Sequence, residues 1–91
     1  MLTFRLKDYV WNPGVGAVEF FGDDDGRPVT FSISRRALAK LEAAPILGGH
    51  DGIRAYKRHL LQIQDFSREV YTRQAPREQD LVVVLSSDHL S

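Results

Sequence analysis

The feature that most constrains the fold is a change of hydrophobic period at residue 34. Before that point, apolar and polar residues alternate, which is typical of half-buried strands. Such runs occur at 2–6, 17–21 and 28–33, and the connections between them contain turn-forming residues. Because these connections are too short for a crossover helix, we expect three antiparallel strands. Residues 7–16 are predicted to form the turn region between the first two strands.

After this point the apolar residues follow a helical period. Ser34 is a suitable N-cap, since its hydroxyl can accept an orphan backbone N–H. A first helix should end before Pro45, because the residue preceding a proline is pushed out of the helical conformation. The longest periodic stretch predicts one continuous helix from about Gly52 to Gln74, with Asp51 as its N-cap.

The apolar run at 81–85 predicts a fourth strand, and a short C-terminal turn should follow it. The expected architecture is therefore a single α+β domain over residues 1–91. Its elements follow the order β-β-β-α-α-β, with two helices packed on one face of an antiparallel sheet.

Composition narrows the possible functions. Twelve Lys and Arg residues oppose twelve Asp and Glu residues, and cysteine is absent. The absence of cysteine excludes disulfides, thiolate zinc sites and cysteine nucleophiles, and the neutral charge argues against a dedicated nucleic-acid binder. No apolar run approaches the roughly 20 residues of a membrane span, so we expect a cytoplasmic protein without a membrane partner.

The acidic run 23–25, followed by Gly26, is the motif closest to a metal site. An EF-hand loop aligned on Gly26 would need carboxylates where the chain has Phe21 and Ser32. We therefore interpret the run as a solvated hairpin turn. No P-loop and no nucleophile elbow occurs in the sequence, so we predict no catalytic residue, no metal, no cofactor and no enzymatic activity.

One histidine, His59, falls on the apolar arc of the predicted long helix. No carboxylate on the same helix face stands at a spacing that would support a general base. We therefore expect a structural role for this residue, with its ring at least partly buried.

Basic residues are concentrated in the helical part of the chain. Residues 35–73 contain eight Lys and Arg residues against four Asp and Glu residues. The candidate anion-contact face consists of Arg35, Arg36, Arg54, Lys57 and Arg58. The alternative interpretation is two ordinary solvated helix faces.

The outer face of the sheet is a second candidate surface. Phe21 interrupts the polar alternation there, and the fourth strand is apolar on both faces. Trp11, in the preceding loop, could reach the same side. The candidate partner surface is therefore Trp11, Phe21, Val82 and Val84. Either a partner or the chain itself, through residues 7–16 or the C-terminal turn, could cover it.

Several segments resemble a known family over nearly the whole chain. They are Gly16–Gly22, Val29–Ile33, the Ala37-Leu38-x-x-Leu41 motif, Ala55-Tyr56, Val70-Tyr71 and the closing Leu85-Ser86-x-Asp88-x-Leu90. Their order is similar to that of the small bacterial domain-of-unknown-function family DUF1488. The resemblance implies an α+β fold and no established activity.

The sequence thus favours a non-catalytic interaction or regulatory module that binds a protein partner or itself, as a weak homodimer. The alternative is a nucleic-acid-associated accessory protein that uses the basic faces of the helices.

Overall fold

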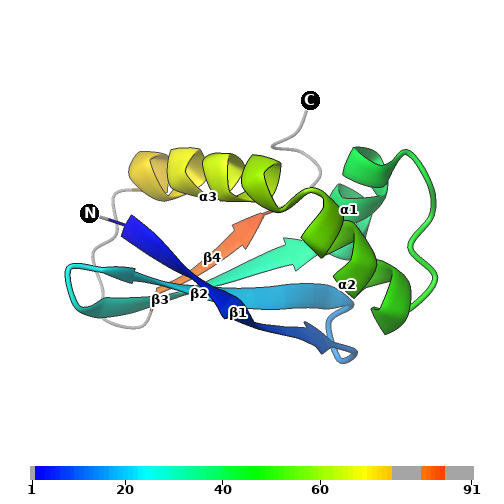
Figure 1. The fold of residues 1–91 in the computed structure, drawn as a ribbon, viewed down its shortest axis with the longest axis horizontal. Coiled ribbons are helices and arrows are strands. Elements are labelled where there is room, and N and C mark those ends of the chain that lie inside the picture. Colours follow the sequence, from blue (N-terminus) through cyan, green and yellow to red (C-terminus); the bar gives the residue numbers. More distant parts are fainter. Residues whose placement is uncertain (1, 75–80, 86–91) are drawn as a thin grey trace.

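The computed structural model of the protein describes residues 2–74 and 81–85, with side chains for 2–73 and 85. A four-stranded sheet carries three helices on one of its faces (Figure 1). The element order is β1 Leu2–Asn12, β2 Ala17–Asp24, β3 Arg27–Ser34, α1 Arg35–Glu42, α2 Gly49–Arg58, α3 Leu60–Gln74 and β4 Leu81–Leu85. The predicted α+β class and element order are confirmed, with one additional helix. The predicted C-terminal turn lies outside the described residues.

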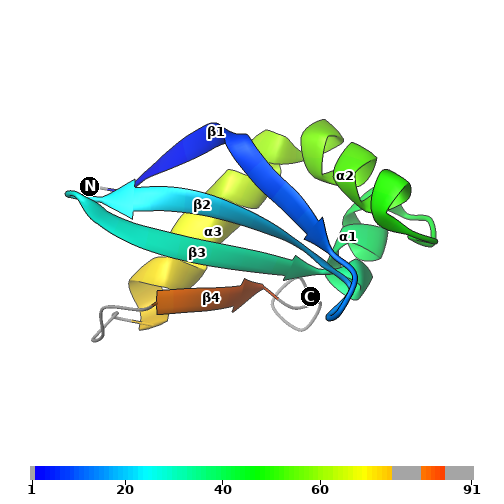
Figure 2. The same cartoon turned by 90° about the horizontal axis from the view of Figure 1, so that it is seen from below.

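The strands lie in the order β1-β2-β3-β4. The first three are antiparallel, as predicted, but β4 runs parallel to β3, so the prediction of a wholly antiparallel sheet is wrong for this strand (Figure 2). Parallel neighbours require a crossover connection, and the three helices between β3 and β4 supply it. Because the crossover stays on one side, none of the helices α1 to α3 lies against the opposite face of the sheet (Figures 1 and 2).

The core lies between the sheet and the helices. Inward residues of β2 and β3 alternate with outward ones, so Phe20 and Phe31 stack at 5.2 Å between ring centroids. Tyr56 of α2 packs against Phe20 at 5.1 Å. Fully buried side chains come from both layers: Val18, Phe31, Ile33, Ala37, Leu38, Ala55, Ile63, Ser67 and Leu85.

The first strand is longer than predicted. It runs to Asn12, so the prediction of a turn region over residues 7–16 is wrong for its first half. The pairing shifts between Phe4, opposite Gly22, and Tyr9, opposite Phe20. Four residues of β1 therefore lie opposite Phe21 alone. This bulge interrupts the alternation of apolar and polar residues, so the second half of the strand cannot be recognised from that alternation.

The long helix predicted from Gly52 to Gln74 is also wrong as one element, because it breaks at His59. This residue has φ −107° and ψ 24°, and its N–H still bonds the carbonyl of Ala55 at 3.0 Å. The apolar residues of α2 and α3 follow one continuous helical period, so the sequence pattern gives no sign of the bend between them. Among the described residues, no helix is long and apolar enough to cross a membrane.

The predicted caps have different outcomes. Ser34 accepts the backbone N–H of Ala37 at 3.1 Å and caps α1, as expected. Asp51 is not an N-cap, because α2 begins at Gly49 with Gly48 as its cap. The Asp51 carboxylate instead lies in the first turn of α2 and accepts the backbone N–H of Leu47 at 3.0 Å. It still satisfies a backbone donor beside this helix start, although the helix begins three residues earlier than predicted.

Candidate functional site

The outer face of the sheet is the face opposite to the three helices. Phe21 lies on this face, half-buried, in the register row of Thr30. Val10 of β1 pairs with Glu19 and leaves 49% of its surface exposed. The sequence reading missed Val10, because it placed this residue in a turn. The sequence signal for Val10 is that it alternates with Tyr9 and Trp11, which both face the helices.

Glu19 and Asp23 flank Phe21 on the same face of β2, two residues to either side. The Arg5 guanidinium binds both carboxylate oxygens of Asp23, at 2.9 and 2.8 Å. The hydrogen bond from Arg5 lowers the pKa of Asp23 and raises that of the guanidinium. The Asn12 amide donates to Glu19 at 3.2 Å. A small apolar centre with a polar rim is the composition expected of a modest protein-contact surface.

The other members of the predicted partner surface have different positions. Val82 and Val84 pair with Thr30 and Ser32, in the register rows of the outer face. The side chains of Val82 and Val84 lie outside the described residues. Trp11 does not belong to this surface.

Trp11 lies within β1 rather than in a loop, and it pairs with the buried Val18 on the helix side of the sheet. The indole packs against two glycines of α2. A Cβ built on Gly49 or Gly52 would lie 2.7 Å from an indole carbon. The prediction that Trp11 reaches the outer face is wrong because the bulge in β1 changes which residues of the strand face the helices. Trp11 therefore anchors α2 to the sheet.

The basic candidate residues mostly have partners within the chain. The Arg54 guanidinium bonds Asp51 at 2.7 Å, and Arg58 lies 3.8 Å from Glu42. Lys57 places its ammonium 5.5 Å from the centre of the Tyr9 ring. Such contacts reduce the positive potential that a polyanion would meet.

The two arginines at the start of α1 lie beside the turn at residues 13–16. Together with that turn they line a hollow of about 460 Å³. The Arg35 guanidinium lies 5.9 Å from the centre of the Trp11 ring. Arg36 has no charged partner within residues 2–74 and 81–85. The predicted anion-contact face thus falls into two groups on different helices, and among the described residues only its Arg36 has neither a carboxylate nor an aromatic ring beside it.

The surroundings of His59 fit the predicted structural role. Its side chain is 21% exposed, so the predicted partial burial is confirmed. The ring nitrogen Nε2 lies 2.9 Å from an oxygen of Glu42. This contact joins the end of α1 to the bend between α2 and α3. Reading one helix face could not find it, since the carboxylate comes from another helix.

Only the end of the acidic run forms the predicted hairpin turn, because β2 continues through Asp23 and Asp24 before turning into β3. Asp25 and Gly26 both have positive φ, 52° and 85°, as a two-residue hairpin turn requires. Asp24 points to the helix side and accepts a hydrogen bond from the Tyr71 hydroxyl at 2.6 Å. That bond lowers the pKa of Asp24, while burial and the same bond raise the pKa of Tyr71.

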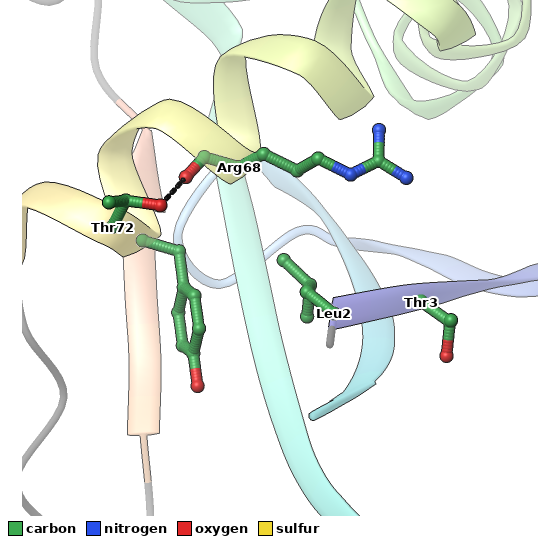
Figure 3. A pocket seen from close by; sticks show the side chains of 5 residues that line it. Leu2, Thr3, Arg68 and Thr72 are labelled. Atoms are coloured by element: carbon green, nitrogen blue, oxygen red, sulfur yellow. Dashed lines mark hydrogen bonds between the residues drawn. The ribbon is translucent and has the colours of Figure 1, made fainter. Parts of the chain in front are cut away.

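A further hollow of about 430 Å³ opens between the start of β1 and the end of α3 (Figure 3). Its lining combines Leu2, Thr3, Arg68, Tyr71 and Thr72. The Thr72 hydroxyl donates to the Arg68 carbonyl at 2.8 Å, and the guanidinium of Arg68 lies over the Phe4 ring at 5.0 Å. The lining places no nucleophile beside a general base. Among the described residues, no group of three or more acidic or histidine side chains could hold a metal.

A comparison with family models identifies the relatives of this chain. The model of the family described as "Protein of unknown function (DUF1488)" matches residues 2–84. The chain belongs to the DUF1488 family. The resemblance seen in the sequence is therefore confirmed. A search of curated proteins found no match.

A solved DUF1488 structure shows the same fold. It is the crystal structure of a protein of unknown function from the DUF1488 family of Shewanella loihica PV-4. The two structures superpose with a TM-score of 0.76 over 90% of each chain, at 16% sequence identity. At this identity the likeness concerns the fold alone, which is thus shared between distant members of DUF1488.

Proposed function

We propose that this DUF1488 protein is a small, non-catalytic, cytoplasmic interaction module that binds a protein partner through the outer face of its sheet. One observation carries the proposal: the crossover places all three helices on one face and leaves Phe21 and Val10 on the other. The face of an antiparallel sheet that lies in water is commonly polar. Apolar residues here, with Arg5, Asp23 and Glu19 around them, fit a contact surface.

Apart from Arg36, the described candidates of the basic face do not favour the alternative of a nucleic-acid-associated protein. A phosphate-binding face needs cations that are free to replace counterions. Here Arg54 and Arg58 face carboxylates, while Arg35 and Lys57 lie over aromatic rings. The arrangement therefore supports a protein partner better than a polyanion.

The test compares two surfaces of the same protein. An outer-face variant, Val10→Ser with Phe21→Ser, is matched by Leu61→Ser on α3, where the leucine is 76% exposed. A protein retained by the wild type from a lysate of the source cells is purified, and its dissociation constant is measured by calorimetry. We expect the outer-face variant to weaken binding about tenfold or more and Leu61→Ser to leave it within about twofold.

Equal affinities for both variants would contradict the proposal, as would failure of the wild type to retain any protein. Retention of nucleic acid that falls steeply with salt would favour the alternative function. Far-UV circular dichroism of each variant shows that the fold is kept.

A further inference from the structure

The two edges of the sheet are built differently. β1 forms one edge and carries features that discourage pairing with another strand. Its bulge places Arg5–Asp8 opposite the single residue Phe21, and this segment includes three charged residues. Bulges and charges on an edge strand are common protections against edge-to-edge association. This edge is therefore closed to strand addition over its middle.

β4 forms the opposite edge of the described sheet, and its own five residues contain neither a bulge nor a charge (Figure 2). Its pairing with β3 is regular from Val29–Leu81 to Ile33–Leu85, without a bulge. The strand contains no charged residue, no proline and no glycine. Within the part of the chain that the structure describes, β3 is its only strand neighbour. A regular apolar edge of this kind is a template for another strand.

The sequence of β4 indicates which strand fits. Leu-Val-Val-Val-Leu reads the same in both directions. In an antiparallel pair centred on Val83, Leu81 lies opposite Leu85 of the second copy, Val82 lies opposite Val84, and Val83 lies opposite itself. Every cross-strand pair then joins identical residues, as a two-fold symmetric interface allows. The equal numbers of acidic and basic residues impose no net repulsion between copies.

We propose that two copies of this chain associate through β4, antiparallel and centred on Val83, to form one continuous sheet. The proposal goes beyond the proposed function, because it concerns the edge of the sheet and not a foreign partner on its outer face. A chain of this size gains from such association, since a small domain buries a limited share of its surface alone.

The first experiment uses charge at positions 82 and 84, whose register neighbours Thr30 and Ser32 lie on the outer face. In the symmetric pair these two positions face each other across the interface. A variant with Val82→Lys and Val84→Lys places like charges opposite each other twice. Its matched control, Val82→Lys with Val84→Glu, places opposite charges there instead.

Sedimentation equilibrium of purified protein measures the mass. The wild type should sediment as a dimer of the 10.3 kDa chain. The Lys–Lys variant should raise the dimer dissociation constant about tenfold or more, and the Lys–Glu variant should stay within about threefold of the wild type. Mixing the Lys–Lys variant with a Val82→Glu, Val84→Glu variant should restore the dimer. A wild type that is monomeric at hundreds of micromolar, or equal effects of both charge variants, would overturn the proposal.

A second experiment does not depend on charged variants. The chain has no cysteine, so Val83→Cys introduces a single thiol at the proposed symmetry axis. Directly opposed antiparallel residues lie within disulfide range. Oxidation should give a covalent dimer in high yield, while Val10→Cys on β1 should give little. Equal yields from both positions would refute the proposed register. Both experiments use purified protein alone, so their failure leaves the outer-face proposal untouched.

Discussion

Adding one methyl group to α2 tests how this helix is held on the sheet. Alanine normally favours a helix over glycine by about 0.8–1.0 kcal/mol, so Gly52→Ala should be stabilising if only the helix mattered. The structure predicts the opposite sign. The new Cβ would lie 2.7 and 2.8 Å from two carbons of the Trp11 ring.

The expected magnitude follows from these distances. Ordinary contacts begin near 3.4 Å, so the indole must move by several tenths of an ångström. It cannot do so freely, because the same ring also packs on Gly49. Overpacking of this kind costs about 1–3 kcal/mol, which exceeds the gain in helix propensity. We expect a net destabilisation of about 1 kcal/mol, or a melting temperature about 4–8 °C lower.

The assay is urea unfolding followed by circular dichroism in every variant, and also by the fluorescence of Trp11, the single tryptophan, in the variants that keep it. The matched control places Gly52→Ala in a Trp11→Val background, where the clash is absent. There the substitution should stabilise the protein by about 0.8 kcal/mol, which gives a coupling of nearly 2 kcal/mol. Stabilisation of equal size in both backgrounds would refute the contact between the indole and α2.

Three further predictions follow from the described contacts. Ser34→Ala should lower the free energy of unfolding by about 1 kcal/mol, measured in urea, because it removes the cap of α1, whereas Ser34→Asp should retain most of it. His59→Ala should destabilise by about 1–2 kcal/mol by removing the partner of Glu42, and a silent substitution would contradict a joint between α1 and the α2–α3 bend. Burial raises the pKa of Tyr56 to about 12, so the folded state keeps this phenol neutral while the unfolded chain ionises near pH 10. Stability from this group is therefore complete below pH 10 and declines as pH rises towards 12; an absorbance titration in which all tyrosines ionise near pH 10 in folded protein would contradict this.

Local signals predicted those parts of the fold that depend on neighbouring residues. The hairpin turn at Asp25-Gly26 and the cap at Ser34 each need only a few adjacent residues, and both are found where expected. The apolar alternation similarly located β2 and β3, because their pairing is regular along its whole length.

The remaining features depend on contacts between distant segments. The bulge in β1 follows from pairing with β2, so its effect on Val10 and Trp11 cannot be read from period alone. At the bend, His59 contacts Glu42 of α1. This contact cannot be found from the hydrophobic pattern of α2 and α3, because Glu42 lies outside both helices. Of the candidate partner surface, Phe21 faces outward, as the alternation predicts. The prediction for Trp11 is wrong, because the register shift in β1 leaves no mark in the sequence.

The parallel pairing of β4 has a consequence for the order in which the chain can fold. β1, β2 and β3 are joined by short turns, so their pairing closes small loops. β4 pairs with residues about 50 positions earlier, across all three helices. During synthesis, β3 therefore remains the open edge of the sheet until the last strand leaves the ribosome. Leu85, fully buried when folded, is then missing from the core. The nascent protein consequently passes through a stage in which the side of β3 that receives β4 can capture any extended apolar segment.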